Sequence, residues 1–567
     1  MKPRIKATQI KPDMTIKKVM QIIQAAPHKA DNVPGHVALA LGKNNKLYGI
    51  VTDGDIRKAL LKGAKLSDSI KPVINTNPIT FNKDLSPEQM LEKTIEAIKS
   101  RSKKRLDIII TVDSKNKPYD IMPFFELWQS TEVKTRVISI IGLGYVGLTL
   151  GLILADTGFK VIGVDKVKSV IDRLNHKKSH IHEPGIINLL HRNHNKNFFV
   201  QHKFDNNDSD VYIICVGTPV NERGQVIFHP LKDALRYITK ILKKGDLVIL
   251  RSTVPIGTCH NLVIPYLEKH TKLKAGEDFF VAFAPERTLE GDALNELRTL
   301  PQVIGGYNKR STDLAIKLFS HLTNSIVGVD NLETAEMVKL LNNSYRDLTF
   351  AFANEAAIIA DKFNLNSQKV IQAANSGYAR SLIPCPSPGV GGYCLSKDPF
   401  ILIESARQKK YQAKLPLLSR QLNNQMINYV CQKVHDFFLS HNKEKNKFKI
   451  FVIGLAFKGE PETADMRHST SLKIIDELKK RYPKIYAYDP VIKRSDIVLK
   501  GLRYLTLKQG FRHADSVLFL NNHSSYKEID IYNYLALMNK PGFLFDGWHM
   551  FSDIINKPLK DITYRGI

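Results

Sequence analysis

The sequence Val-Ile-Ser-Ile-Ile-Gly-Leu-Gly-Tyr-Val-Gly, residues 137–147, decides the fold of most of this 567-residue chain. A run of β-forming residues leads directly into G-x-G-x-x-G, and an apolar helical stretch follows. In this motif Gly142 permits a tight turn, Gly144 lets the backbone approach a pyrophosphate, and Gly147 allows the helix to pack closely on the strand. The motif predicts a βαβ unit that binds a dinucleotide at the N-terminus of its helix.

A second expected strand, at 160–164, ends in Asp165, roughly twenty residues beyond the glycines. A carboxylate at this position accepts hydrogen bonds from ribose hydroxyls, which favours NAD over NADP. Lys166 and Lys168 could hold a 2′-phosphate, so NADP stays open as an alternative. A glycine turn without a ligand is the plainer alternative.

Outward from this motif, short apolar strands alternate with helical stretches over most of the chain. Such alternation predicts parallel sheets covered by helices. We therefore expect an α/β protein with two Rossmann-like, doubly wound parallel-sheet domains, at 136–325 and 441–567. A segment at 326–440, helical in period, joins them.

The first 130 residues (1–130) contain an internal repeat of a different kind. Residues 36–51 have the pattern strand, polar turn, strand, and residues 107–122 repeat it after a helical stretch at 87–100. Tyr48 and Tyr119 fall at the same offset in the two copies. A duplicated β-β-α unit of this size resembles a tandem CBS-type module.

The segment Gly-Ile-Val-Thr-Asp-Gly-Asp-Ile-Arg, residues 49–57, is similar to the most recognisable signature of CBS modules. The resemblance implies that Thr52 and Asp55 face a nucleotide, with an adenine nucleotide as the expected ligand. Pro123 and Glu126 stand at the matching positions of the second copy, so at most one well-formed site is expected. The alternative is a folded spacer or dimer contact that binds nothing.

The bulk composition is that of an ordinary globular protein, with 43% hydrophobic and 24% charged residues. The net charge of +28 raises the question of nucleic-acid binding, but lysines spread along the whole chain favour solvated surface charge instead. No apolar run reaches the roughly 18 residues that a membrane span needs, and the N-terminus lacks a secretory pattern, so a cytoplasmic location is expected. Five scattered cysteines argue against a disulfide framework and against a metal site.

The segment Pro-Gly-Val-Gly-Gly-Tyr-Cys-Leu-Ser-Lys-Asp-Pro, residues 388–399, carries the most reactive candidate side chain; we call it the Cys394 loop. Small residues leave Cys394 poorly protected, and main-chain N–H groups and Lys397 lie next to it. Such surroundings predict a favoured thiolate, the reactive form of cysteine. A buried apolar cysteine is the alternative.

Several motifs follow one another in an order similar to that of the UDP-glucose/GDP-mannose dehydrogenase family. The resemblance covers residues 135–567 and leaves the N-terminal module outside. The motifs are G-x-G-x-x-G at 142–147, His-Glu-Pro-Gly at 182–185, Val-Gly-Thr-Pro at 216–219, Ser-Thr-Val-Pro at 252–255, Pro-Glu-Arg at 285–287, Lys339 to Asn343, the Cys394 loop, Ala-Phe-Lys at 456–458 and Asp-Met-Arg at 465–467.

Members of this family oxidise the C6 alcohol of a sugar nucleotide to the acid with two NAD⁺. The resemblance implies that Cys394 captures the intermediate aldehyde as a thiohemiacetal and then carries a thioester, which water hydrolyses. Lys339 and Asn343, four residues apart on an expected helix, would stabilise the oxyanion. Asp398 would organise the water that acts as base near Lys339.

The resemblance implies further site residues. Glu286 would assist the acyl-enzyme steps, and Thr253 would hold a water. The structural alternatives are that Glu286 pairs with Arg287, that Thr253 caps a turn, and that Lys339 lies on a solvated helix face. The cofactor residues implied beside the glycines are Tyr145, Val146, Asp165, Thr218 and Thr253. The substrate residues implied are Glu286, Arg287, Lys339, Asn343, Arg346, Gly391, Lys458 and Arg467.

The stretches Asn-Ser-Tyr-Arg-Asp at 343–347 and Phe-Ala-Asn-Glu at 352–355 resemble members acting on UDP-N-acetylhexosamines. The chain departs from that branch in two places: Tyr393 replaces its histidine, and Asp-Gly-Trp-His at 546–549 lies where many relatives have an arginine that meets the substrate across the dimer. We expect UDP-N-acetyl-mannosamine or UDP-N-acetyl-glucosamine as substrate, for polysaccharide synthesis. UDP-glucose 6-dehydrogenase and an inactive nucleotide-sensing homologue are the alternatives. A homodimer or higher homo-oligomer is expected.

Overall fold

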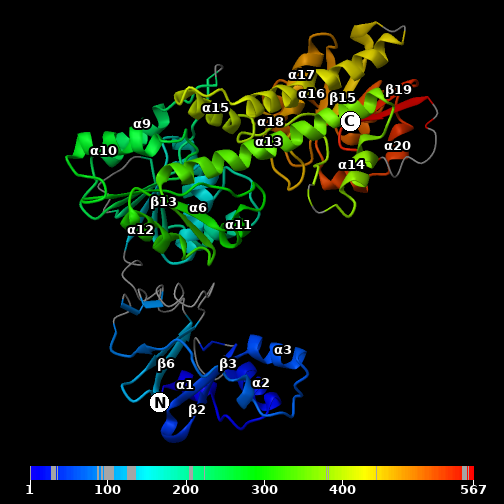
Figure 1. The fold of residues 1–567 in the computed structure, drawn as a ribbon. Coiled ribbons are helices and arrows are strands. Elements are labelled where there is room, and N and C mark those ends of the chain that lie inside the picture. The colour runs from blue at the N-terminus through cyan, green and yellow to red at the C-terminus, as the bar shows by residue number, and fades with distance from the viewer. Residues whose placement is uncertain are drawn as a thin grey trace. The chain divides into compact units, whose positions relative to one another are not determined.

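The computed structural model describes residues 2–26, 33–34, 36–85, 89–90, 93–94, 108–123, 136–202, 209–221, 224–378, 380, 382–441, 444–551, 559 and 561–567. The chain divides into two compact units, Met1–Thr135 and Arg136–Ile567 (Figure 1). Glu126 and most of the helix expected at 87–100 lie outside the described residues.

The first unit holds two small sheets that repeat one topology. Their orders are β1-β2-β3 and β4-β5-β6, and in each a two-residue strand pairs in parallel with a strand that pairs antiparallel with the next. The register slips at the same place in both, at Leu41 in the first sheet and at Val112 in the second. The expected duplication is therefore confirmed. The strands are β1 Gln9–Ile10, β2 Val37–Leu41, β3 Leu47–Thr52, β4 Phe81–Asn82, β5 Ile108–Val112 and β6 Pro118–Pro123.

The two small sheets share one apolar core, to which β2 contributes Val37 and Leu39 and β5 contributes Ile108 and Ile110. Three described helices complete this unit: α1 Pro3–Thr8, α2 Ile16–Ala25 and α3 Asp53–Leu61. Helix α3 begins directly after β3, at the signature that contains Thr52 and Asp55.

The second unit begins with an eight-stranded sheet in the order β14-β13-β12-β11-β10-β7-β8-β9. Neighbouring strands are parallel except β12 and β13, which are antiparallel. The strands are β7 Val137–Ile141, β8 Lys160–Val164, β9 Phe198–Gln201, β10 Val211–Ile214, β11 Leu247–Leu250, β12 Phe280–Phe283, β13 Gln302–Gly306 and β14 Ile326–Val329. The helices are α6 Tyr145–Asp156, α7 Lys168–Asn175, α8 Ile186–Asn193, α9 His229–Ile238, α10 Ile264–Thr271, α11 Ala293–Thr299 and α12 Lys309–Phe319.

A 31-residue helix, α13 Leu332–Lys362, leads from this sheet to the rest of the second unit (Figure 1). It begins at Asn331, whose side chain accepts the Thr334 N–H at 2.8 Å, a regular N-cap. Helix α16 Lys414–Leu439 packs along α13. Helices α14 Ser367–Asn375 and α15 Asp398–Gln408 lie between them in sequence, and the Cys394 loop leads into α15.

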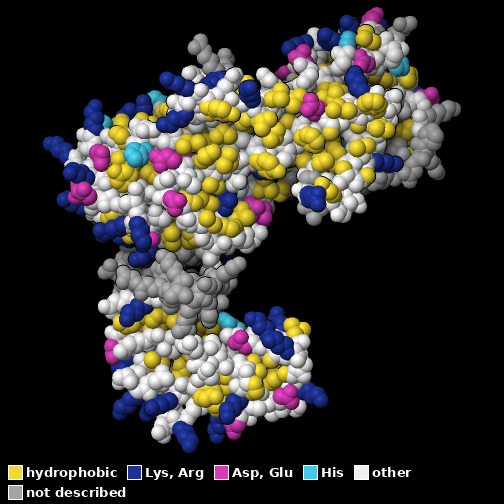
Figure 2. All heavy atoms as spheres, viewed as in Figure 1, with side chains coloured by type: hydrophobic (Ala, Val, Ile, Leu, Met, Phe, Trp, Pro, Cys, Tyr) yellow, Lys and Arg dark blue, Asp and Glu magenta, His cyan; other side chains and the backbone are white. Residues whose placement is uncertain are grey.

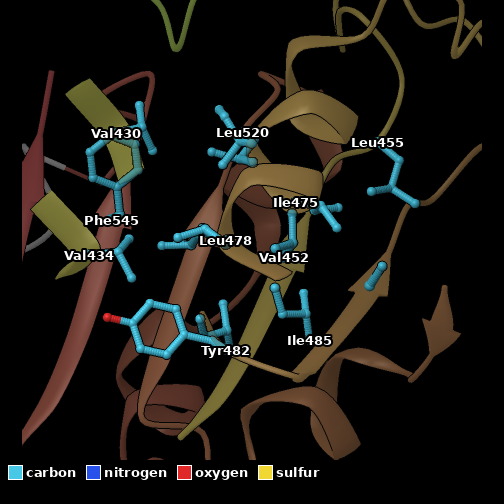
Figure 3. Packing of buried hydrophobic residues seen from close by; sticks show 14 of the residues in the cluster. Val430, Val434, Val452, Leu455, Ile475, Leu478, Tyr482, Ile485, Leu520 and Phe545 are labelled. Carbon is cyan, nitrogen blue, oxygen red and sulfur yellow. The ribbon is translucent and has the colours of Figure 1, made fainter. Parts of the chain in front are cut away.

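The last sheet has the order β17-β16-β15-β18-β19-β20, with every neighbouring pair parallel. Its strands are β15 Lys449–Ile453, β16 Lys484–Tyr488, β17 Arg503–Tyr504, β18 Ser516–Phe519, β19 Gly542–Asp546 and β20 Ile562–Gly566. Its helices are α17 Thr470–Lys479, α18 Arg494–Leu499, α19 Leu507–Phe511 and α20 Ile531–Leu535. Val434 of α16, Leu478 of α17 and Phe545 of β19 share one buried core, so the end of α16 belongs to this domain (Figure 3).

The expected fold class is confirmed: two doubly wound α/β domains joined by helices, with a CBS-pair-like module before them. None of the described helices combines the length and the apolar character needed to cross a membrane.

Candidate active site

The glycine motif has the geometry of a dinucleotide-binding turn. Gly142 has φ 92°, in the left-handed region that favours glycine. A Cβ on Gly147 would lie 1.9 Å from the carbonyl oxygen of Gly142, so only glycine allows this approach of helix α6 to the loop. A Cβ on Gly144 would meet no atom within 4 Å, which leaves the backbone at the start of α6 open to a ligand. The residues therefore fit a dinucleotide pyrophosphate.

A cavity of about 320 Å³, here called the α6 cavity, opens at this helix N-terminus and is lined in part by Gly144, Tyr145 and Arg467. Asp165, at the end of β8, accepts hydrogen bonds from the N–H groups of Leu143 and Val167, both at 2.8 Å. Its carboxylate is thereby held beside the glycine loop, where an adenosine ribose would lie. The Tyr145 hydroxyl donates to Glu183.

A second cavity, of about 350 Å³, contains the Cys394 side chain; we call it the Cys394 cavity. The domain of the eight-stranded sheet, the joining helical segment and the domain of the six-stranded sheet all line it. They contribute Arg287, Thr288, Leu289 and Glu290; Lys339, Asn343, Arg346 and Phe350; Ser387, Gly389, Val390, Gly391, Gly392, Tyr393 and Leu395; and Phe457, Lys458, Glu460, Asn522 and Trp548. The structure thus brings Lys339, Asn343, Arg346, Gly391 and Lys458 together with Cys394.

A fully buried carboxylate, Asp398, organises the base of this site. Asn343 donates from Nδ2 to Asp398 Oδ2 at 2.6 Å, and Lys397 donates from Nζ to Oδ1 at 2.6 Å. Burial lowers the pKa of Lys397, but the charge of Asp398 and its hydrogen bond outweigh burial, so the pKa of Lys397 is raised. The Lys339 ammonium group has no hydrogen-bond partner among the described residues and faces the cavity.

The protonation of Cys394 differs from the sequence-based expectation. Burial, and then the Asp398 carboxylate, raise the pKa of the Cys394 thiol above its usual value. Lys339 and Lys397 pull in the opposite direction without reversing the shift. The direction of this shift is opposite to the one expected for a favoured thiolate, because desolvation outweighs the two cations. The Cys394 side chain is nevertheless exposed, as the small residues around it predict.

Glu286 lies outside the wall of the Cys394 cavity. Arg251 donates to its Oε2 at 2.5 Å, and the N–H groups of Arg287 and Thr288 donate to its Oε1, both at 2.8 Å. Although burial opposes the shift, Arg251 and the Thr288 N–H lower the pKa of Glu286. An ion pair was the sequence-based alternative for Glu286, but its partner is Arg251 rather than Arg287.

Thr218 and Thr253 are also placed away from both cavity walls. Thr218 donates from Oγ1 to the carbonyl oxygen of Thr253 at 2.5 Å, which ties the loops after β10 and β11 together. Val146 lies in the first turn of α6, next to the glycine loop.

Two residues expected at the sugar nucleotide occupy different cavities. Lys458 lines the Cys394 cavity, donates to the carbonyl oxygen of Glu290 at 2.5 Å, and has its pKa lowered to about 8 by burial. Arg467 lines the α6 cavity instead, where it pairs with Asp465 at 2.7 Å.

Sequence reasoning did not single out Glu290, which lines both cavities. Burial, and then the Asp465 carboxylate, raise the pKa of Glu290 to about 7. Its position four residues after Glu286, beside Gly291, was the available sequence signal. Its contact with residues far along the chain, such as Arg467, could not be inferred locally.

In the first unit, Thr52 and Asp55 form a capping box at the start of α3. Asp55 Oδ2 accepts the Thr52 N–H at 3.0 Å and the Thr52 hydroxyl at 2.7 Å. The two residues are therefore adjacent and held by each other. Asp55 also borders a cavity of about 410 Å³ together with Lys58 and Lys62.

Comparisons with known proteins agree with this geometry. Family models match residues 136–323 (UDP-glucose/GDP-mannose dehydrogenase family, NAD binding domain), 333–425 (its central domain) and 451–553 (its UDP binding domain). UDP-N-acetyl-D-mannosamine dehydrogenase of Pyrococcus horikoshii is 31% identical over 432 residues, which are 76% of this chain and 98% of that protein. The chain belongs to the UDP-glucose/GDP-mannose dehydrogenase family. A CBS domain model matches residues 3–62.

The chain is also similar to other members of the family, in sequence and in structure. UDP-N-acetyl-D-mannosamine dehydrogenase of Campylobacter jejuni is 34% identical over 69% of this chain and 96% of its own length. The solved structure of the Pyrococcus horikoshii UDP-D-ManNAc dehydrogenase has a TM-score of 0.70, covering 76% of this chain and 99% of its own. That of UDP-N-acetyl-mannosamine dehydrogenase from Staphylococcus aureus has a TM-score of 0.65 at 29% identity, covering 76% and 98%.

Membership of the family confirms the expected enzyme class and cofactor: the protein is an NAD-dependent nucleotide-sugar dehydrogenase. The α6 cavity lies between the part matched by the NAD binding domain and the part matched by the UDP binding domain, which contributes Thr463, Ala464, Asp465 and Arg467. Phe457, Lys458 and Trp548 of the Cys394 cavity come from the latter part. No cluster of His, Cys, Asp and Glu that could hold a metal ion occurs among the described residues.

Proposed function

We propose that this protein oxidises the C6 alcohol of a UDP-N-acetylhexosamine to the uronate, through a covalent intermediate on Cys394. UDP-N-acetyl-mannosamine and UDP-N-acetyl-glucosamine are the proposed substrates. The observation that carries the proposal is the position of the Cys394 thiol in a cavity shared with Lys339 and Asn343. UDP-N-acetylmannosamine is favoured because relatives at 31–34% identity are named for it.

NAD, when bound, accepts the hydride in each of the two oxidations. Between them, Cys394 Sγ adds to the carbonyl carbon of the aldehyde, its proton leaves to solvent, and the C=O electron pair moves onto oxygen. The Lys339 ammonium and the Asn343 amide stabilise that oxygen. After the second oxidation, water adds to the thioester, the C–S bond breaks, and the carboxylate, the Cys394 thiol and one proton are released.

The raised pKa of Cys394 fits this sequence of steps. A thiol that stays protonated until an aldehyde is bound is less exposed to oxidants and other electrophiles. Asp398 holds Lys397 and Asn343 in place during these steps. Water bound near Lys339, as proposed base, would accept the proton of the C6 hydroxyl.

The substrate's diphosphate would meet the cations of the Cys394 cavity. Arg287, Arg346 and Lys458 line its wall, and the lowered pKa of Lys458, about 8, lets an anion stabilise its charged form. Tyr393 and Trp548 provide apolar faces for rings. Glu286, Thr218 and Thr253 act from behind this wall, through the loops that they tie down.

Initial rates of NADH formation with a panel of UDP-sugars test the substrate. The proposal predicts that a UDP-N-acetylhexosamine gives at least a tenfold higher kcat/KM than UDP-glucose. A preference for UDP-glucose would establish the alternative, UDP-glucose 6-dehydrogenase. No NADH with any sugar, in the presence of an adenine nucleotide, would favour the inactive sensor.

We further propose that a second copy of the chain covers the outer face of α13. Tyr345, Phe352 and Ile359 repeat every seven residues on this helix and are 68%, 57% and 55% exposed. Figure 2 shows apolar side chains gathered where α13 runs in Figure 1. An apolar face of this kind favours association. Light scattering should give twice the chain mass, and Phe352→Glu should give the monomer; a monomeric wild-type protein would contradict the proposal.

An adenine nucleotide at Thr52 and Asp55 is the proposed regulator. The support is the capping box, which places the Asp55 carboxylate at the start of α3, beside a cavity with two lysines. Titration with AMP, ADP and ATP should raise the melting temperature of the full chain, and Asp55→Ala should remove the effect. No change in melting temperature or rate with any of the three would rule it out.

A further inference from the structure

A buried arginine fastens the Cys394 loop to the two long helices behind it. Arg420 of α16 donates from Nη1 to Asp347 Oδ1 of α13 at 2.6 Å. The same guanidinium donates to two main-chain carbonyl oxygens of the loop, those of Val390 and Leu395, both at 3.4 Å. Cys394 therefore lies directly before one fastened carbonyl and four residues after the other.

A chain of side-chain amides extends from the same ion pair to the start of the loop. Asn423 of α16 donates to the carbonyl oxygen and to Oδ1 of Asp347, both at 2.9 Å. Its own oxygen accepts from Asn354 Nδ2 at 2.9 Å, and Asn354 accepts the Ser387 N–H at 2.8 Å. One buried network thus holds two main-chain positions within the loop and a third at Ser387, the residue directly before it.

The anchor of the loop lies on the same helix face as the candidate catalytic side chains. Lys339, Asn343 and Asp347 are spaced four residues apart on α13, so they share one side of the helix, and all three are buried. This face supplies the two groups proposed for the oxyanion and also the anchor for the loop that carries Cys394. A change in the ion pair therefore moves Sγ relative to Lys339 and Asn343.

Stability alone explains this ion pair poorly. The Arg420 and Asp347 side chains are 2% and 0% exposed, and taking two charges out of water offsets much of their attraction. Among the described residues, Arg420 Nε and Asp347 Oδ2 also find no hydrogen-bond partner. Such a pair is better explained by what it holds in place.

We propose that Arg420 and Asp347 are positioning residues that hold the Cys394 thiol where the aldehyde is formed. The thiol then adds to the aldehyde faster than the aldehyde dissociates from the enzyme. The inference rests on the proposed role of Cys394. Addition of Sγ to the C=O carbon, with the thiol proton lost to solvent, forms the thiohemiacetal oxyanion without net oxidation. When Sγ is displaced, this addition slows, whereas aldehyde release does not. More aldehyde then leaves after one oxidation, and NADH formed per sugar consumed falls below two.

Arg420→Lys is the variant that tests the proposal. Lysine keeps a cation for Asp347, but its single nitrogen cannot occupy the positions of both Nη1 and Nη2, from which the two loop carbonyls are reached. Lys433→Met is the matched control, because the Lys433–Asp361 pair, at 2.6 Å, joins the same two helices away from the loop. We measure NADH per sugar consumed, with an aminooxy reagent present to trap free aldehyde. The expected ratio is close to one in Arg420→Lys, with at least fivefold more trapped aldehyde, and two in Lys433→Met.

A ratio of two in Arg420→Lys, at whatever rate, would overturn the proposal, since loss of folded enzyme lowers the rate without changing the stoichiometry. Should that variant fail to fold, Asn354→Ala, which releases the loop only at Ser387, is judged by the same ratio. A wild-type ratio other than two would contradict the proposed function itself, so the two failures are distinguishable.

Discussion

At the scale of single residues, the Asp398 carboxylate acts on the site in two opposed ways. It holds Lys397 and Asn343 by short hydrogen bonds, and, after burial, it raises the pKa of Cys394. We expect Asp398→Asn to lower the pKa of Cys394 and yet to reduce turnover at least tenfold, because the two donors lose their charged acceptor. The pH dependence of Cys394 alkylation by iodoacetamide measures the first effect, and NADH formation measures the second.

The control for this prediction is Asp361→Asn, which removes a carboxylate on α13 that pairs with Lys433 outside the Cys394 cavity. It should leave both quantities unchanged. An alkylation midpoint that stays the same or rises in Asp398→Asn would show that the carboxylate does not set the protonation of Cys394.

The sequence predicts candidate residues where the signal is local. Cys394 and Asp398 stand in one short segment, and Lys339 and Asn343 are one helical turn apart, so their convergence in one cavity was foreseeable. The raised pKa of Cys394 could not be foreseen from the sequence, because it depends on how far the folded protein desolvates the thiol. The Arg251–Glu286 pair was also missed, since 35 residues separate the partners.

At the scale of structural elements, the loop between β7 and α6 contains two glycines with different constraints. A Cβ at Gly147 would overlap the Gly142 carbonyl, whereas a Cβ at Gly144 would meet nothing. We expect Gly147→Ala to destabilise the protein by about 1–3 kcal/mol, the usual range for overpacking. We expect Gly144→Ala to leave the melting temperature unchanged and to raise the KM for NAD at least fivefold.

Each glycine variant serves as the control for the other, because both make the same substitution at positions three residues apart in one motif. Thermal unfolding and NAD titration of both variants measure the two effects. Equal losses of stability in the two would contradict the assignment of Gly144 to the cofactor approach.

Helix α13 also carries a buried carboxylate whose ionisation should affect stability. Burial raises the pKa of Glu336 to about 7, although the N–H groups of Gly257 and Cys259 donate to it. Because the pKa in the folded state lies above the unfolded value, this group favours folding at low pH, and its contribution is lost as pH rises through about 7. A shift of this size corresponds to about 3 kcal/mol.

We therefore expect the melting temperature of the wild-type protein, relative to Glu336→Gln, to fall as pH rises from 4.5 to about 7 and to level off above that. Glu355→Gln, an exposed position on the same helix, should show no such pH dependence relative to the wild type. A constant difference between wild type and Glu336→Gln over this range would contradict the prediction.

Elements with a strong local pattern could be predicted from the sequence. The buried polar contacts that these elements make could not. The helical period within 326–440 indicated helices, and α13 at Leu332–Lys362 confirms this. That Asp347 and Asn354 on this helix fasten the Cys394 loop depends on the approach of α16, which no local pattern records.

At the scale of the whole molecule, the chain has two compact units, and the relatives account for one of them. The Pyrococcus horikoshii relative is matched over 98% of its length by only 76% of this chain. We expect a chain of residues 136–567 to fold and to form NADH within about twofold of the full chain, because its two sheets and joining helices form one compact unit.

Removal of residues 1–135 should also abolish any response of the rate to adenine nucleotides. Circular dichroism and NADH formation, with and without ATP, measure both expectations. A truncated protein that responds to ATP as the full chain does would place the regulatory site outside the CBS-like module.

The strand–helix alternation predicts the α/β class, but not the full order of the sheets. The antiparallel pairing of β12 with β13 and the addition of β14 beyond it result from contacts between segments that no periodicity links. The duplication in the first unit was predictable because residues at a constant offset, such as Tyr48 and Tyr119, carry the repeat themselves.

The central claim, covalent catalysis by Cys394, is tested most directly by the number of NADH molecules formed per sugar consumed, followed at 340 nm with the preferred UDP-sugar. The account predicts two for the wild-type protein. It predicts at most one for Cys394→Ala, with no uronate formed, because the aldehyde has no thiol to capture it. Two NADH and a normal yield of uronate from Cys394→Ala would contradict the account.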